Sequence, residues 1–189
     1  MKKLMNILMR VIAVFVILFI MLGVLANYQK GRFDEMNQPA WDSFDASSAT
    51  GELIIDKDKG LSLQFKNKDL VLVRKKPLKP QVLFSDYKKN FYHLKMYVKD
   101  LRLDGKKEII FQADRKMYER EMYIFSEMDK KKIKKFNGKG EFWNLGNLKF
   151  TEKNKIYIRS CGSQYCDDTY YIWNGIKLNK EYTDSYESM

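Results

Sequence analysis

The sequence predicts an all-β fold of antiparallel, blade-like or sandwich-like sheets that follows one N-terminal apolar helix. The helix is indicated by the stretch from Val11 to Ala26, sixteen residues without a polar side chain. The sheets are indicated by short runs of alternating polar and apolar residues after Gly51. Twelve Tyr and twelve Phe beside only three Pro are typical of a β-rich domain rather than a disordered chain. We therefore expect an apolar segment at residues 1–26, a linker at 27–50, an all-β domain at 51–180 and a flexible tail at 181–189.

The apolar stretch is nearly long enough to cross a membrane. Sixteen helical residues span about 24 Å, whereas a bilayer core is about 30 Å thick. Extension back to Leu4 gives about 35 Å and includes Arg10, whose long apolar stem lets its charge reach the headgroups. Basic residues precede the stretch, and those that follow are offset by Asp34 and Glu35. This bias predicts a single-pass inner-membrane anchor with the N-terminus in the cytoplasm and the rest of the chain outside.

A cleaved signal peptide is the alternative interpretation of the same stretch. Val24-Leu25-Ala26 provides small residues for cleavage after Ala26, which would release a secreted or periplasmic protein. The stretch has no amphipathic period, and this argues against the buried helix of a soluble core. Both interpretations place residues 33–189 outside the cytoplasm.

The charge of the chain is basic but not extreme. Five of its 35 basic residues lie in the first 32 positions and all 24 acidic residues lie later, so the remainder carries a net charge of +6. An exported domain rarely meets nucleic acid, which is therefore not an expected partner. The expected partner is an envelope protein or an anionic envelope component, with the membrane contacted through the N-terminal helix.

The linker contains four apolar residues with approximately helical spacing: Phe33, Met36, Trp41 and Phe44. They suit either a short amphipathic helix on the membrane surface or side chains that dock onto the domain. The first predicted strands then follow at residues 52–56, 61–66, 70–74, 81–86 and 91–98. Residues 66–69 form a hairpin turn, and Pro77 and Pro80 force an extended connection.

Residues 100–112 align with residues 147–159 at an offset of 47. In each copy a polar loop precedes a strand, then an aromatic strand, then a basic one. The expected strands are 108–113, 122–126 and 132–136 in the first copy, and 155–160, 170–174 and 176–180 in the second. A period near 47 fits one four-stranded, propeller-like blade.

The loop Asp100-Leu-Arg-Leu-Asp104-Gly105-Lys-Lys-Glu108 resembles a degenerate FG-GAP or VCBS-type repeat, the integrin-like blade with a calcium loop. The resemblance covers residues 98–180 and implies that Asp100, Asp104 and Glu108 match the calcium ligands. Arg102 stands where the family has another oxygen ligand, and the second copy offers Asn147, Thr151 and Lys155. We therefore expect a loop that shapes a hairpin without a metal ion or other cofactor.

The sequence contains no recognisable catalytic motif, and its single histidine, His93, is expected on the exposed side of a strand. We therefore expect a non-enzymatic binding or interaction module of the cell envelope. The alternative is an envelope hydrolase whose site is built from scattered carboxylates and tyrosines. A deep cleft with two close acidic side chains would favour the hydrolase, and a flat aromatic face or an exposed sheet edge would favour the binding module.

The basic run at residues 130–139 is expected to be an edge strand or hairpin, where lysines block unwanted strand pairing. Binding of anionic headgroups is the alternative role.

The two cysteines, Cys161 and Cys166, lie in the exported part and flank a short connection between two predicted strands. A hairpin brings such residues within disulfide range, so we expect a bond that presents Gln164 and Tyr165 at a rigid tip. Two free thiols in a cytosolic protein are the alternative.

Overall fold

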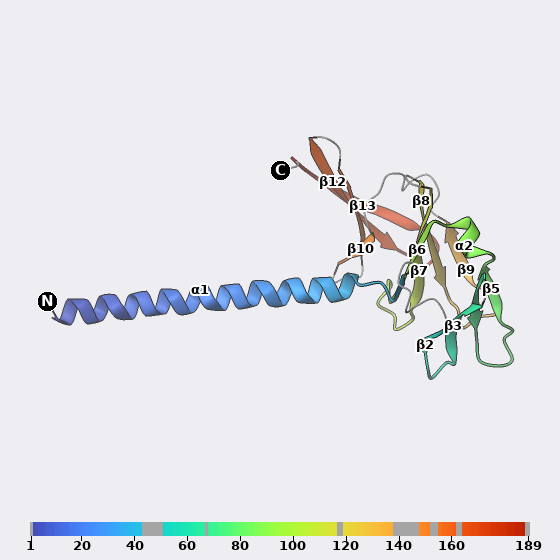
Figure 1. Ribbon diagram of the computed structural model, residues 1–189, viewed down its shortest axis with the longest axis horizontal. Helices are drawn as coiled ribbons and strands as arrows, with labels where there is room; N and C mark the ends of the chain where they lie inside the picture. Colours follow the sequence, from blue (N-terminus) through green and yellow to red (C-terminus); the bar gives the residue numbers. More distant parts are fainter. Residues whose placement is uncertain are drawn as a thin grey trace. The chain divides into compact units, whose positions relative to one another are not determined.

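The computed structural model describes residues 2–42, 51–66, 68–116, 119–137, 148–151, 155–161 and 164–187. The chain divides into two compact units, Met1–Gln38 and Pro39–Met189 (Figure 1). The first unit is helical and the second contains the β-sheets. This confirms the predicted fold class, an all-β domain after one N-terminal apolar helix.

The first unit is one long helix, α1 (Lys2–Asn37). Its 36 residues correspond to a length of about 54 Å. The expected linker from residue 27 is therefore wrong over its first eleven residues. Once an apolar helix is formed, each further residue adds a hydrogen bond without a new nucleation cost, and residues 27–37 contain no proline. The Asn37 side chain donates to the Phe33 carbonyl at 2.8 Å, and the helix ends before Pro39.

The second unit consists of three antiparallel sheets, which we number along the chain. Sheet 1 contains β2 (Glu52–Asp56), β3 (Leu61–Lys66), β4 (Asp69–Val73) and β5 (Gln81–Phe84). Sheet 2 has the order β1 (Trp41–Asp42), β6 (His93–Lys99), β7 (Glu108–Lys116), β8 (Glu119–Ser126) and β9 (Lys134–Asn137). Sheet 3 contains β10 (Leu148–Phe150), β11 (Ile156–Cys161), β12 (Tyr165–Trp173) and β13 (Leu178–Glu187). The short helix α2 (Tyr87–Asn90) connects β5 to β6.

The main hydrophobic core contains residues of sheets 1 and 2. Leu63 and Leu72 of sheet 1 and Met96 and Phe111 of sheet 2 are fully buried in one cluster. Phe84 adds edge-to-face ring contacts with Phe111 and Tyr123, both at 5.0 Å between centroids. The apolar residues that alternated in the sequence therefore face each other across the two sheets.

Trp41 attaches the start of the second unit to this core. Its side chain is 5% exposed and stacks on Phe65 at 4.4 Å, while the Ala40 N–H donates to the Met96 carbonyl at 2.8 Å. Trp41 therefore docks onto the domain, which is one of the two predicted alternatives, rather than lying on a membrane-surface helix. Phe33 and Met36 lie within α1, and Phe44 lies outside the described residues.

Sheet 3 packs against the face of sheet 2 that points away from sheet 1. Phe150 contacts Tyr97 at 5.1 Å, and Trp173 contacts Phe136 at 5.7 Å. The Leu148 N–H donates to the Gln112 side chain at 2.8 Å. Sheet 2 is consequently covered on both faces, which explains why Ile110 and Ile124 are as buried as Phe111.

Two predictions on the second half of the chain have different outcomes. The basic run does lie at an edge, because β9 is the last strand of sheet 2. The flexible tail expected at 181–189 is wrong for residues 181–187, because β13 continues to Glu187 and pairs with β12. Residues 188 and 189 lie outside the described part of the chain. The strand also begins later than expected, since the Asn174 side chain accepts the Ile176 and Lys177 N–H groups at 2.9 Å and makes a turn there.

Candidate functional site

One face of sheet 3 carries three successive rows of side chains that run across β11, β12 and β13. Residues two positions apart in a strand point to the same side of the sheet. Residues that are directly paired on neighbouring strands therefore form a row across the sheet, and every second row lies on the same face. The strand register defines an aromatic row, a charged row and a disulfide row. We call this surface the row face; its members are Tyr157, Tyr170 and Tyr182, then Arg159, Asp168 and Asp184, then Cys161, Cys166 and Tyr186.

The aromatic row is a stack of three tyrosine rings. The centroids of Tyr157 and Tyr170 lie 5.3 Å apart with an interplanar angle of 23°, and those of Tyr170 and Tyr182 lie 4.4 Å apart at 17°. Burial raises the pKa of Tyr157 and of Tyr170, so both phenols stay neutral near pH 7. Exposure rises from 7% at Tyr157 to 44% at Tyr182. The stack therefore ends in an exposed ring at the edge of the sheet.

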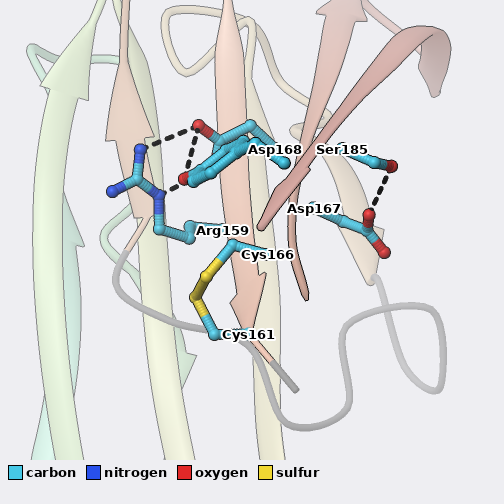
Figure 2. The surroundings of a disulfide bond; sticks show 7 residues. Arg159, Cys161, Cys166, Asp167, Asp168 and Ser185 are labelled. Atoms are coloured by element: carbon cyan, nitrogen blue, oxygen red, sulfur yellow. Dashed lines mark hydrogen bonds and ion pairs between the residues drawn. A yellow bond between two sulfur atoms is a disulfide. The ribbon is translucent and has the colours of Figure 1, made fainter. Parts of the chain in front are cut away.

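The charged row is centred on a bidentate ion pair. The Arg159 guanidinium donates to both Asp168 carboxylate oxygens at 2.8 Å (Figure 2). These hydrogen bonds hold the pKa of Asp168 below its usual value and raise the pKa of Arg159. Asp184 lies beside Asp168 on β13 and is exposed. Within the described part of the chain, no hydrogen bond or ion pair engages the Asp184 carboxylate.

The disulfide row closes the hairpin between β11 and β12. Cys161 and Cys166 are directly paired, and their sulfur atoms are bonded with 4.0 Å between the Cα atoms, which confirms the predicted bond (Figure 2). Tyr186 completes the row and donates to Asp168 at 3.4 Å, while the Arg159 guanidinium lies 5.4 Å from its ring centre. The ion pair therefore contacts Tyr186, and Cys166 is the residue paired with it on β12.

Gln164 and Tyr165 lie beyond the disulfide, as predicted, and both are exposed. Residues 162 and 163 of the connection lie outside the described part of the chain. Figure 1 shows the ends of β12 and β13 reaching past the other strands of the three sheets. The disulfide row lies at these ends, because Cys166 is near the start of β12 and Tyr186 is near the end of β13.

The outer two strands of sheet 3 are acidic although the chain as a whole carries a net charge of +11. The strands β12 and β13 contain five acidic residues and one basic residue, Lys180. The acidic residues are Asp167, Asp168, Glu181, Asp184 and Glu187. Of these five, Asp168 and Asp184 belong to the row face. Cationic side chains lie close by: Arg159 binds Asp168, and Lys149 Nζ lies 5.8 Å from the centre of the Tyr157 ring. Lys155 Nζ lies 2.5 Å from Glu181 and 5.9 Å from the centre of the Tyr182 ring.

The three candidate metal ligands lie in one loop but bind protein groups. The Asp100 carboxylate accepts the N–H groups of Asp104 at 3.1 Å and of Gly105 at 2.7 Å. Arg102 lies between the other two carboxylates, at 3.2 Å from Asp104 and 2.9 Å from Glu108. Within the described ranges, no three His, Cys, Asp or Glu side chains form a group suited to a metal ion. The contacts observed here shape the loop before β7.

Glu108 has no exposed surface, and burial raises its pKa against the opposing effects of the Leu101 N–H and the Arg102 guanidinium, both at 2.9 Å. Two further carboxylates of sheet 2, Asp114 and Glu121, also bind arginine. Asp114 binds Arg120, and Glu121 binds Arg115 at 3.0 Å and accepts a hydrogen bond from Tyr123. His93 faces Asp114 at 3.6 Å and its side chain is 13% exposed, so the expected exposed histidine is largely buried.

Comparison of the chain with protein-family models, with curated proteins and with solved structures finds no match. The function is therefore inferred from the row face and from the helix.

Proposed function

We propose that this chain is a membrane-anchored or exported binding module of the cell envelope, without enzymatic activity, and that the row face binds a partner protein. The observation that carries the proposal is the tyrosine stack that ends in exposed Tyr182 at the sheet edge. Tyrosine supplies a large amphipathic contact area with few rotatable bonds, which is why it is enriched in binding surfaces. The disulfide and the Arg159–Asp168 pair support the same surface, so little ordering would be needed on binding.

The proposed location is the outer side of the inner membrane. Helix α1 is long and apolar enough to span a bilayer. The basic residues Lys2, Lys3 and Arg10 precede its apolar part, which supports a single pass with the second unit outside the cytoplasm. The disulfide supports the same side of the membrane, because such bonds persist in oxidising compartments. Cleavage after Ala26, giving a periplasmic or secreted domain, is the alternative.

The exposed Asp184 carboxylate at the end of the charged row favours a partner protein that brings a cationic group to this position. An anionic envelope component would instead suit the lysine-rich segment around β9. Several of those lysines are already engaged, because Lys130 and Lys134 approach Glu127 at 3.0 and 3.5 Å. Lys135 lies 5.1 Å from the centre of the Tyr123 ring. These contacts leave the row face as the better supported surface.

The hydrolase alternative gains no support from the carboxylates. Among the described residues, the buried carboxylates are Glu108, Glu121 and Asp168, and each accepts a hydrogen bond from an arginine. A general acid or base must be able to exchange its proton with a substrate, and a carboxylate held by arginine is poorly suited to that.

The resemblance to FG-GAP or VCBS-type repeats is part of the proposal. The main meander of sheet 2 and the whole of sheet 3 each follow the same plan, with four consecutive antiparallel strands. Sheet 1 also has this plan, so the support for a shared origin comes from the sequence offset of 47, which aligns β7 with β11 and β8 with β12.

The proposal is tested by crosslinking and purifying the full chain from membranes and comparing two tyrosine variants. Tyr182→Ser removes the exposed ring of the row face, whereas Tyr92→Ser removes a ring that is 71% exposed and lies just before β6. Because a central tyrosine can contribute about 2 kcal/mol to an interface, we expect about thirtyfold weaker binding, and correspondingly less recovered partner, with Tyr182→Ser. The Tyr92→Ser variant should recover as much partner as the wild type. Equal recovery with both variants would reject the row face as the binding surface.

A further inference from the structure

The outer side of β13 is a long exposed strand edge. With ten residues β13 is the longest strand of the domain, and eight of its residues are exposed. It is the last strand of sheet 3, and no strand in the described part of the chain pairs with its outer side. The unpaired N–H and C=O groups of such an edge are a template for another extended segment.

The usable part of this edge is residues 182–187. The register between β12 and β13 shifts between Tyr170 and Tyr171, and Glu181 is the extra residue of the resulting bulge. A bulge interrupts regular pairing, so an added strand would not continue past it. From Tyr182 to Glu187 the register with β12 is unbroken over six positions. Six residues provide about 20 Å of regular edge, which is the length of an ordinary strand.

Two rows of the row face end at this edge with a side chain that could pair with a side chain of an added strand. Tyr182 ends the aromatic row, and Asp184 ends the charged row without a cation among the described residues. Side chains directly opposite each other on neighbouring strands interact, and aromatic pairs and opposite charges are the favourable ones. A strand added at this edge would therefore place an aromatic residue beside Tyr182 and a lysine or arginine beside Asp184.

A second copy of β13 suits this edge poorly. Antiparallel pairing centred on Asp184 would place the two Asp184 carboxylates directly opposite each other, which is destabilising. Pairing centred on Thr183 would place each Tyr182 opposite an aspartate rather than an aromatic ring. The acidic edge is instead complementary to a basic segment of a different protein.

We propose that the edge of β13 at residues 182–187 binds an extended segment of its partner by strand addition. The segment carries an aromatic residue and, two positions away on the same face, a lysine or arginine. This inference rests on the proposed function and adds to it the mode of binding and the chemistry of the partner.

The test measures binding of labelled peptides to the full chain in lipid nanodiscs by fluorescence anisotropy. The probe is TVYTKTYVT, in which the two tyrosines and the lysine share one face of a strand, and the comparison peptide TVYTETYVT has glutamate in place of lysine. Because like charges opposed across strands are unfavourable and opposite charges favourable, we expect the lysine peptide to bind about fivefold more tightly. Asp184→Lys should reverse this order. Asp58→Lys, the same charge change in the turn between β2 and β3, should leave the order unchanged.

Two backbone-methylated forms of the lysine peptide test strand addition itself. Methylation of alternate nitrogens removes the N–H groups on one edge of the peptide, so one form should lose binding and the other should retain it. The inference is overturned if neither peptide binds, if both methylated forms bind equally, or if Asp184→Lys does not reverse the charge preference. If partner recovery still depends on Tyr182 in any of those cases, the row face remains the binding surface and only strand addition is rejected.

Discussion

Arg159 and Asp168 form the central ion pair of the row face, and its contribution to stability should depend on pH. The pKa of Asp168 is lowered by its hydrogen bonds to Arg159, so the carboxylate stabilises the fold when it is charged. This stabilisation is present above the pKa of an unfolded aspartate, about 3.9, and is lost as the pH falls through the lower folded pKa.

We expect Asp168→Asn to lower the free energy of unfolding by about 1 kcal/mol at pH 7. Hydrogen bonds between charged groups are stronger than this, but the Arg159 side chain is 44% exposed and solvent weakens the pair. The difference from the wild type should shrink below about pH 4, when the wild-type carboxylate becomes protonated. Denaturant unfolding from pH 7 to pH 3 measures it, with Asp58→Asn as the control. A difference that stays constant over this range would contradict the assignment.

Arg102 gives a second expectation at the scale of single residues. Its guanidinium lies between Asp104 and Glu108, so we expect calcium to leave the melting temperature of the protein unchanged. A site saturated at 100 times its dissociation constant would add about 2.7 kcal/mol, which a thermal scan detects easily. A clear upward shift with calcium would instead support the ligand set of the FG-GAP resemblance.

The hairpin of β11 and β12 shows what the sequence predicts at the scale of elements. Once Cys161 and Cys166 are expected to pair directly, counting outwards along the two strands pairs Arg159 with Asp168 and then Tyr157 with Tyr170. The pairing of two of the three strands of the row face, β11 and β12, therefore follows from the sequence. The pairing of the third strand, β13, does not follow, because the bulge at Glu181 changes its register with β12 and no local sequence pattern marks the position of the bulge.

The ends of elements were less predictable than their types. Helix α1 continues beyond the end of its apolar run because helix propagation is cooperative. The hydropathy of the sequence does not reveal this continuation. The chain after residue 180 is polar, and its strand is stabilised by pairing with β12 rather than by burial. The ion pairs of Glu108 and Glu121 depend on which strands become neighbours, and that information is not local in the sequence.

We expect the Cys161→Ser/Cys166→Ser double variant to unfold with about 2 kcal/mol less free energy than the oxidised wild type. The closed loop is short, so the bond removes only a modest amount of conformational entropy from the unfolded chain. Denaturant unfolding of both proteins measures the loss, and adding reductant to the wild type should reproduce it. Thiol labelling without reductant is the independent check, because two reactive thiols in protein from its native compartment would contradict the bond.

At the scale of the whole molecule, α1 should hold the protein in the membrane. We expect the full chain to remain with membranes after a carbonate wash, because an apolar spanning helix is not released by removing charge contacts. Protease should reach the second unit only after the outer compartment is opened. A mature N-terminus at Asn27 would reject the anchor and support the cleaved form.

The most direct test of the central claim, that the row face binds a partner outside the cytoplasm, is site-specific photocrosslinking in intact cells. A photoreactive side chain replaces Tyr182 in one variant and Tyr92 in another, since both tyrosines are exposed but only Tyr182 belongs to the row face. We expect a discrete protein adduct from position 182 and none of that size from position 92. The claim is contradicted if position 182 gives no adduct at normal expression, or if the two positions give the same adduct.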